Sequence, residues 1–146
     1  MSYFINKVYI VTGATSGIGH AIALDLAQRG AIVGIHHHRS VEDVQDEIKA
    51  IQKHSPKSIS LRGDLRQSGS VEPLVQRMIQ TFGGIDGLVN NAGAIYDYGD
   101  FQTLSTEAWD QTFAVNTRAP FEWMRSVWPH FLDRGGGKII NISSAT

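Results

Sequence analysis

The stretch that decides the fold is Val8-Tyr9-Ile10-Val11 followed by Thr12-Gly13-Ala14-Thr15-Ser16-Gly17-Ile18-Gly19. Its first four residues form a short continuous apolar run, which is typical of a strand covered on both faces. Ile18, Ile22 and Leu26 then recur every four residues, a spacing that predicts a helix with one buried stripe. The stretch therefore predicts a strand, a glycine-rich turn and a helix in direct succession.

The same two patterns, a short apolar run and a helical spacing of apolar residues, alternate along the rest of the chain. Further strands are expected at 31–35, 58–61, 85–89 and 138–142, and helical spacing occurs at 41–51, 71–82 and roughly 105–132. Parallel strands need crossover connections, which repeated strand–helix–strand units provide. We expect an α/β fold with a Rossmann-like doubly wound parallel sheet of about five strands, in one domain over residues 1–146.

Composition narrows the functional classes. The 146 residues carry 13 Lys and Arg against 14 Asp and Glu, and 42% are apolar. This near-neutral balance argues against a nucleic-acid or anionic-membrane partner. The absence of cysteine excludes disulfides and thiolate metal sites. The first seven residues do not resemble a secretory leader, and no apolar run is long enough to span a bilayer, so we expect a cytoplasmic protein.

The glycine-rich turn has the features of a phosphate cradle. Gly13 permits a tight turn, Gly17 lets the backbone approach a pyrophosphate, and Gly19 lets the helix lie against the strand. Free N–H groups at the positive helix end attract the anion. A P-loop would need a lysine here, and a nucleophile elbow would need glycine in place of Ala14. An ordinary turn remains the alternative. The residues expected to contact a dinucleotide are Gly13, Thr15, Ser16, Gly17, Ile18 and Gly19.

Together with later motifs, this turn resembles the short-chain dehydrogenase/reductase family over the whole chain. The later motifs are Asp64-Leu65, Asn90-Asn91-Ala92-Gly93, Asn116 within Phe113–Phe121, and Ile140-Asn141-Ile142-Ser143-Ser144. The resemblance implies NAD(P)-dependent hydride transfer between a small-molecule carbonyl and an alcohol. It implies that Ser144 polarises the carbonyl oxygen and that Asn116 supports a proton relay. It also assigns cofactor contacts to Asp64, Leu65, Asn91, Ala92 and Gly93, although the asparagines could equally cross-link neighbouring strands.

The end of the second expected strand bears on the choice of cofactor. His36-His37-His38-Arg39-Ser40 contains no carboxylate to bind the ribose hydroxyls of NAD. Arg39 can instead form a charge-assisted fork with a 2′-phosphate, and His38 can add a donor. The segment is similar to one in the pteridine-reductase branch of the family, which favours NADP(H) over NAD(H). Alternatively, Arg39 binds no ligand and is only a charged, solvent-exposed residue at the end of a strand. We expect no metal site, because strand alternation separates His37 from its two neighbours.

The family's Tyr-x-x-x-Lys pair has no counterpart where the resemblance places it, on a helix after the last expected strand. Of the four tyrosines (Tyr3, Tyr9, Tyr96 and Tyr98), only Tyr3 has Lys four residues later. Tyr3 and Lys7 precede the first expected strand, whereas the resemblance places the pair on a helix that follows Ser144. We therefore expect a chain that is truncated at its C-terminal end relative to the family and inactive in isolation. A non-catalytic NADP(H)-binding module or pseudoenzyme, and a fold remnant without a ligand, are the alternatives.

Two features predict self-association. The last expected strand would be a bare sheet edge, which invites pairing with another chain. The helix before it is rich in large apolar side chains, and the family resemblance places a dimer contact there: Phe121, Trp123, Met124, Trp128 and Phe131. Packing on the sheet would claim some of these side chains. We expect a homo-oligomer.

Overall fold

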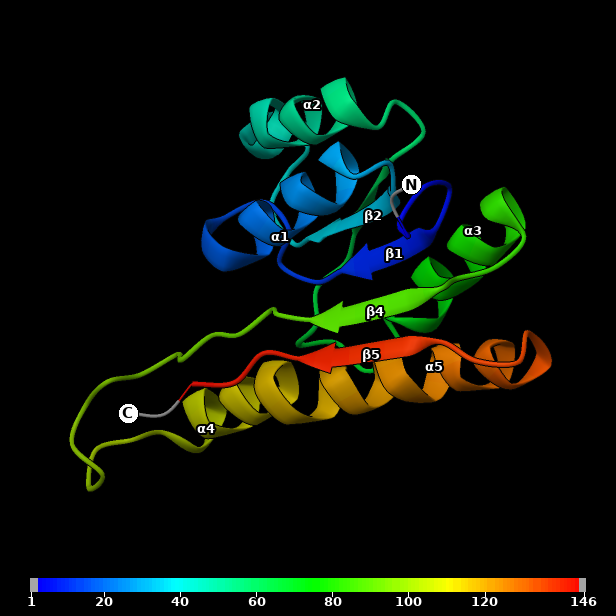
Figure 1. Cartoon of the computed structure of the whole chain (residues 1–146). Helices are drawn as coiled ribbons and strands as arrows, with labels where there is room; N and C mark the ends of the chain where they lie inside the picture. The colour runs from blue at the N-terminus through cyan, green and yellow to red at the C-terminus, as the bar shows by residue number, and fades with distance from the viewer. Residues whose placement is uncertain (1–2, 145–146) are drawn as a thin grey trace.

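The computed structural model describes residues 3–144, so the outermost two positions at each end of the expected domain lie outside the described residues (Figure 1). The sheet contains β1 (Val8–Val11), β2 (Ile32–His37), β3 (Ile59–Arg62), β4 (Gly87–Asn90) and β5 (Lys138–Asn141). The helical segments are α1 (Gly17–Gln28), η1 (Glu42–Val44), α2 (Gln45–His54), α3 (Glu72–Phe82), α4 (Thr106–Phe113), η2 (Ala114–Arg118) and α5 (Ala119–Asp133). All strand pairs are parallel. The predicted doubly wound α/β fold is confirmed.

The sheet separates two hydrophobic cores. Alternate residues of β1 point to opposite faces: Val8 and Ile10 join one core, and Tyr9 and Val11 join the other. The helices α3 and α5 cover the first face, whereas α1 and α2 cover the second (Figure 1). This two-sided burial explains why β1 is a continuous apolar run rather than an alternating one.

The strand order places the carboxyl ends of β1 and β4 side by side. The order is β3-β2-β1-β4-β5, so the chain moves outward from β1 to β3 and then returns to the other side of β1. Val11 of β1 is in register with Val89 of β4. A reversal of this kind opens a crevice at the strand ends, where open α/β sheets bind ligands. The glycine turn after β1 and the loop after β4 meet at this crevice.

One local prediction was wrong. Ile18, expected in the buried stripe of α1, is 64% exposed, because α1 approaches the sheet closely through the small residues Gly19, Ala23 and Ala27. The helical stretch expected at roughly 105–132 is confirmed, since α4, η2 and α5 follow one another without a break, and the π-helical η2 lies within it. Single π-helical turns are frequent at functional sites.

Exposed apolar side chains lie on β5 and α5, and also in the loop after β4, where Tyr98 and Phe101 are each 85% exposed. The strands β1, β2 and β4 are buried throughout, whereas β5 pairs only with β4 and Ile140 is half exposed. Phe121, Trp128 and Leu132 project from α5 into solvent. Within residues 3–144, no helix combines the length and apolarity needed to cross a membrane.

Candidate functional site

The glycine turn is tightly built against α1. Gly13 has φ +63°, a left-handed conformation that favours glycine. A Cβ on Gly19 would overlap the carbonyl of Gly13 and the side-chain amide of Asn91. Helix α1 can therefore begin directly against the turn only because residue 19 has no side chain, as the motif predicts.

The amino end of α1 is available to a ligand. The N-cap residue Ser16 makes no side-chain capping hydrogen bond, and the first turn of α1, all of it described, contains no acidic residue. Gly17 has φ +49° and faces open space. The first N–H groups of a helix have no partner within the helix, and its amino end carries partial positive charge. The residues present therefore fit the pyrophosphate of a dinucleotide.

Thr12 joins the glycine turn to the loop after β4. Its Oγ1 accepts hydrogen bonds from the backbone N–H groups of Asn91 and Ala92, both at 2.9 Å. The Asn91 Nδ2 group donates to the Thr12 carbonyl at 2.9 Å. On the other side, Asn90 Nδ2 donates to Asn141 Oδ1 of β5 at 2.8 Å. The asparagines thus cross-link neighbouring strands, as one interpretation of the sequence predicted, and Asn91 also lines the crevice.

His36 ties the glycine turn to the loop after β3. Its Nδ1 accepts from the Gly13 N–H at 3.2 Å, so its Nε2 carries the proton and donates to the Gly63 carbonyl, also at 3.2 Å. The ring is 2% exposed and contacts Trp123 edge-on at 5.5 Å between centroids. Burial disfavours the charged imidazolium and lowers the pKa of His36 to about 4. His36 is therefore a neutral connector at neutral pH.

His37 has the opposite tautomer and fixes the backbone of Arg39. Its Nδ1 donates to the Arg39 carbonyl at 3.0 Å, and its Nε2 accepts from the Ser60 hydroxyl at 2.7 Å. Burial also lowers the pKa of His37. His38 lies beyond the end of β2 and is exposed. No group of three or more metal-ligating side chains occurs among residues 3–144.

Arg39 reaches from the end of β2 back to the glycine turn. Its Nη2 donates to the Thr15 carbonyl at 3.2 Å and lies 4.0 Å from Glu47 Oε1 of α2. The side chain is 40% exposed, and Arg39 lines the same groove as Thr15, Ser16 and His38. The guanidinium therefore stands at one end of the crevice with its free donors open to an anion.

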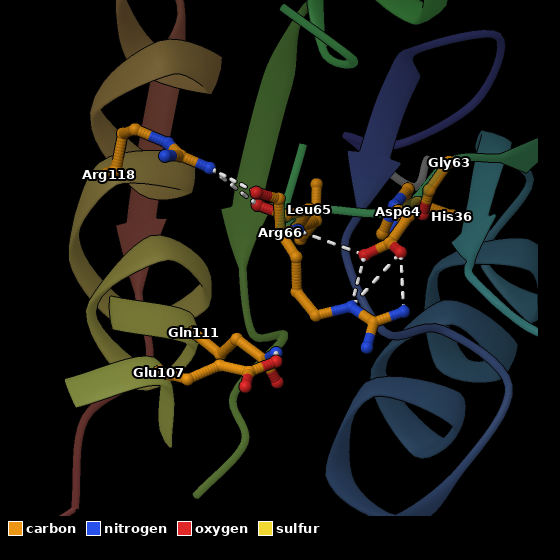
Figure 2. A network of polar contacts seen from close by, with 8 residues as sticks. All are labelled: His36, Gly63, Asp64, Leu65, Arg66, Glu107, Gln111 and Arg118. Carbon is orange, nitrogen blue, oxygen red and sulfur yellow. Dashed lines mark hydrogen bonds and ion pairs between the residues drawn. The ribbon is translucent and has the colours of Figure 1, made fainter. Parts of the chain in front are cut away.

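Figure 2 shows how the loop after β3 is held from two sides. His36 binds Gly63 on one side, and Arg118 of η2 donates to the carbonyls of Leu65 and Arg66, at 3.4 and 2.6 Å, on the other. Asp64 Oδ1 accepts from the Arg66 N–H at 3.0 Å, and the Arg66 guanidinium binds both carboxylate oxygens. The hydrogen bond from Arg66 lowers the pKa of Asp64. Asp64 thus reaches the groove as an anion while also forming the turn.

The other end of the crevice carries the residues expected to be catalytic. Asn116 lies in η2, where its Nδ2 donates to the carbonyls of Thr112 and Ala94 and its Oδ1 accepts from the Ala94 N–H. The side chain of Asn116 therefore holds the loop after β4 in place. Ser144 follows β5, is exposed, and lines the same groove as Asn116.

The expected site residues meet in two adjoining grooves. The first, of about 460 Å³, is lined by the glycine turn, His38, Arg39, Asp64, Leu65 and the loop after β4. The second, of about 710 Å³, is lined by Asn116, Ser143 and Ser144. Both grooves include Ile18, Asn91, Ala92 and Gly93, and Gly19 lies behind them. Several lining residues were not predicted from the sequence. His36 lies in the segment used to choose the cofactor, but its side chain was given no role in the groove, and Tyr96 belongs to no motif.

The family comparison agrees with this geometry. A family model described as short chain dehydrogenase matches residues 7–146. The chain belongs to the short-chain dehydrogenase family. An uncharacterized oxidoreductase of Thermotoga maritima is 38% identical to this short-chain dehydrogenase chain over 141 residues, which are 97% of this chain and 55% of that protein. The chain thus spans about half the length of the curated relatives it matches.

Two solved structures show that both nicotinamide cofactors occur among similar proteins. A metagenomic short-chain oxidoreductase in complex with NADP superimposes with a TM-score of 0.90 at 34% identity, over 98% of this chain and 63% of that one. An NADH-dependent reductase complexed with NAD gives 0.88 at 26% identity, over 98% of this chain and 61% of that one. Family membership therefore leaves the cofactor preference of this short-chain dehydrogenase open.

Proposed function

We propose that this chain binds NADP(H) along the two adjoining grooves as the dinucleotide-binding part of a short-chain oxidoreductase. The amino end of α1 holds the pyrophosphate, Asp64 and Leu65 contact the adenine, and Arg39 with His38 binds the 2′-phosphate. The observation that carries this proposal is the position of Arg39, fixed by His37 and Thr15 at the end of the groove that begins at Gly17. The NADP-bound relative supports it.

The reaction proposed is hydride transfer between the cofactor and a small-molecule carbonyl or alcohol. When bound, NADP(H) supplies or accepts the hydride. Ser144 donates a hydrogen bond to the substrate oxygen, where negative charge develops during carbonyl reduction. Asn116 holds the loop after β4 through Ala94 and belongs to the proton relay. A reductase also needs a proton donor.

The one Tyr-x-x-x-Lys spacing in this sequence, Tyr3 to Lys7, precedes β1. Lys7 binds Asp86 there, at the amino ends of β1 and β4, away from the crevice at the carboxyl ends of the strands. An isolated phenol has a pKa near 10 and is a poor donor at neutral pH without such a partner. We therefore propose that residues 1–146 bind cofactor without turning over substrate by themselves.

We further propose a homo-oligomer located in the cytoplasm. Phe121, Trp128 and Leu132 form exposed apolar surface on α5, and β5 presents an open sheet edge. Both surfaces favour pairing with a second copy of the chain. Light scattering at tens of micromolar tests this point: a clean monomer would contradict self-association.

Titration of the chain with NADPH and NADH, followed by cofactor fluorescence, tests the proposed function. We expect tighter binding of NADPH and no steady oxidation of it when carbonyl compounds are added. Equal or tighter binding of NADH would contradict the role of Arg39. Steady carbonyl reduction by a sample with the verified mass of residues 1–146 would contradict the requirement for a missing proton donor. If neither cofactor binds, the proposed function is contradicted, and the chain is a fold remnant without a ligand.

A further inference from the structure

We propose that Glu47 weakens the discrimination in favour of NADP(H) by competing with the 2′-phosphate for Arg39. This inference rests on the proposed function, since it assigns a specificity-determining residue to the same site. Glu47 lies in the first turn of α2, next to the groove but not in its lining. Sequence motifs of the chain give it no role.

The guanidinium of Arg39 lies beside Glu47 and also lines the groove. Arg39 Nη2 lies 4.0 Å from Glu47 Oε1 and donates to the Thr15 carbonyl at 3.2 Å. The two side chains are 40% and 35% exposed, so each is partly shielded from solvent. Among residues 3–144, the acidic neighbours Glu42, Asp43 and Asp46 form no ion pair with Arg39. Glu47 is therefore the carboxylate best placed to act on this guanidinium.

Two opposing effects of Glu47 have to be weighed. A carboxylate beside Arg39 restrains its side chain, which would favour binding of a phosphate. The same carboxylate neutralises part of the guanidinium charge and repels a 2′-phosphate, which carries about −1.5 to −2 charges at neutral pH. The first effect is small here, because the Thr15 carbonyl already anchors Arg39 Nη2 and His37 already anchors its backbone. The repulsion therefore dominates.

Substitution Glu47→Gln separates charge from shape. The amide has nearly the same size, so the variant keeps the packing of α2 while losing the negative charge. We expect the affinity for NADPH to rise about three- to tenfold at low salt, the range expected for a partly exposed charge acting on a phosphate dianion. The affinity for NADH should stay within about twofold, because its ribose carries no phosphate at this position. The gain should shrink as salt is added.

Asp46→Asn is the matched control. Asp46 precedes Glu47 in the same first turn of α2 and also favours the amino end of that helix, but it forms no ion pair with Arg39 among the described residues. Any loss of helix stability is therefore shared by the two variants, and only Glu47→Gln should raise the ratio of NADPH to NADH affinity. In an Arg39→Ala background, Glu47→Gln should raise that ratio much less.

The outcomes separate this inference from the proposed function. If the unmodified chain prefers NADPH and Glu47→Gln leaves the affinity ratio unchanged or lowers it, the role of Glu47 is overturned while the proposed function stands. If Asp46→Asn raises the ratio as much as Glu47→Gln, the effect belongs to the general charge of α2 and the specific role of Glu47 is also overturned. If the unmodified chain shows no preference for NADPH, the proposed cofactor preference falls and this inference falls with it.

Discussion

The two ends of the crevice differ in how firmly their side chains are held. The first groove, where we propose that the adenosine part of the cofactor binds, is called the adenosine end. There Arg39 and Asp64 each have fixed partners, and His36 links the glycine turn to the loop that carries Asp64. At the catalytic end, Ser144 is exposed beyond β5, and the side chain of Asn116 binds the neighbouring loop. Because Asn116 is also held, by hydrogen bonds to Thr112 and Ala94, the contrast rests on the exposed Ser144.

The difference follows from the strands that carry each end. The glycine turn and Arg39 follow β1 and β2, which are buried on both faces and lie inside the sheet, although Asp64 follows β3, the other edge strand. Ser144, which we propose to be catalytic, follows β5, an edge strand whose residues are mostly exposed. A strand paired on both sides has less freedom to move than an edge strand, so the adenosine end should be the more resistant to disturbance. Each prediction below tests this contrast.

The largest expected effect is that of Gly19→Ala. The added Cβ would overlap the Gly13 carbonyl, so α1 must shift away from the turn. We expect a loss of about 1–3 kcal/mol in the free energy of unfolding and at least tenfold weaker NADPH binding. The comparison variant is Gly69→Ala, whose added Cβ meets open space. Gly69, unlike Gly19, has a positive φ of +80°, so Gly69→Ala should cost stability through backbone strain while leaving NADPH binding unchanged. Urea unfolding and NADPH titration check both variants, and equal binding by Gly19→Ala and the unmodified chain would contradict the tight fit.

The next effect is a dependence of stability on pH through His36. Its pKa is about 4 in the folded chain and near 6.5 in the unfolded chain, so the unfolded state binds the extra proton between these values. The contribution of His36 to stability is therefore complete above about pH 6.5 and is lost as the pH falls toward 4. From pH 6.5 to 5, the free energy of unfolding should fall by about 1.5 kcal/mol because of this group.

The variant His36→Asn tests this dependence. Its side-chain oxygen can still accept from the Gly13 N–H, but the side chain does not titrate. Urea unfolding at pH 6.5 and 5 should show a clearly smaller loss of stability in this variant than in the unmodified chain. An unchanged loss would show that His36 is not the group responsible.

A smaller and more selective effect is expected for Arg39→Gln. Loss of a charge-assisted fork to the 2′-phosphate should weaken NADPH binding about 10- to 100-fold. NADH binding should change by less than about twofold, because the shape of the groove is retained. Fluorescence titrations with both cofactors measure the ratio, and a parallel loss of both would mean that Arg39 supports the turn instead of the phosphate.

The smallest effect is expected for Asp64→Asn. The amide oxygen can still accept from the Arg66 N–H and preserve the turn, but the ion pair with the Arg66 guanidinium is lost. We expect a two- to fivefold loss of affinity, of about the same size for NADPH and NADH, since both cofactors contain adenine. A change confined to NADPH would place Asp64 near the 2′-phosphate and not near the adenine.

Much of the fold could be predicted because its signals are local. The apolar run of β1, the glycine spacing after it and the strand–helix alternation each follow from the chain's own periodicity. The exposure of Ile18 could not be predicted, because it depends on how closely α1 approaches the sheet through Gly19 and Ala23. The π-helical conformation of η2 could not be predicted either, because the spacing of apolar residues does not distinguish it from an α-helix.

In the site, motif residues could be placed but their connections could not. The sequence placed Arg39 and Asp64 at strand ends, and both line the first groove. It gave no sign that His36 would bridge Gly13 and Gly63, 50 residues apart in the chain, or that Glu47 would approach Arg39. Such contacts arise from the packing of separate elements, which no local pattern records.

The most direct test of cofactor binding at the amino end of α1 is an NMR titration of the ¹⁵N-labelled chain with NADP⁺. We predict large, saturable shifts of the backbone amides of Gly13, Gly17, Ile18 and Gly19, with Arg39 and Asp64 shifting at the same ligand concentration. Saturable shifts confined to residues outside the two grooves, or no shifts in a folded chain at millimolar NADP⁺, would contradict this account.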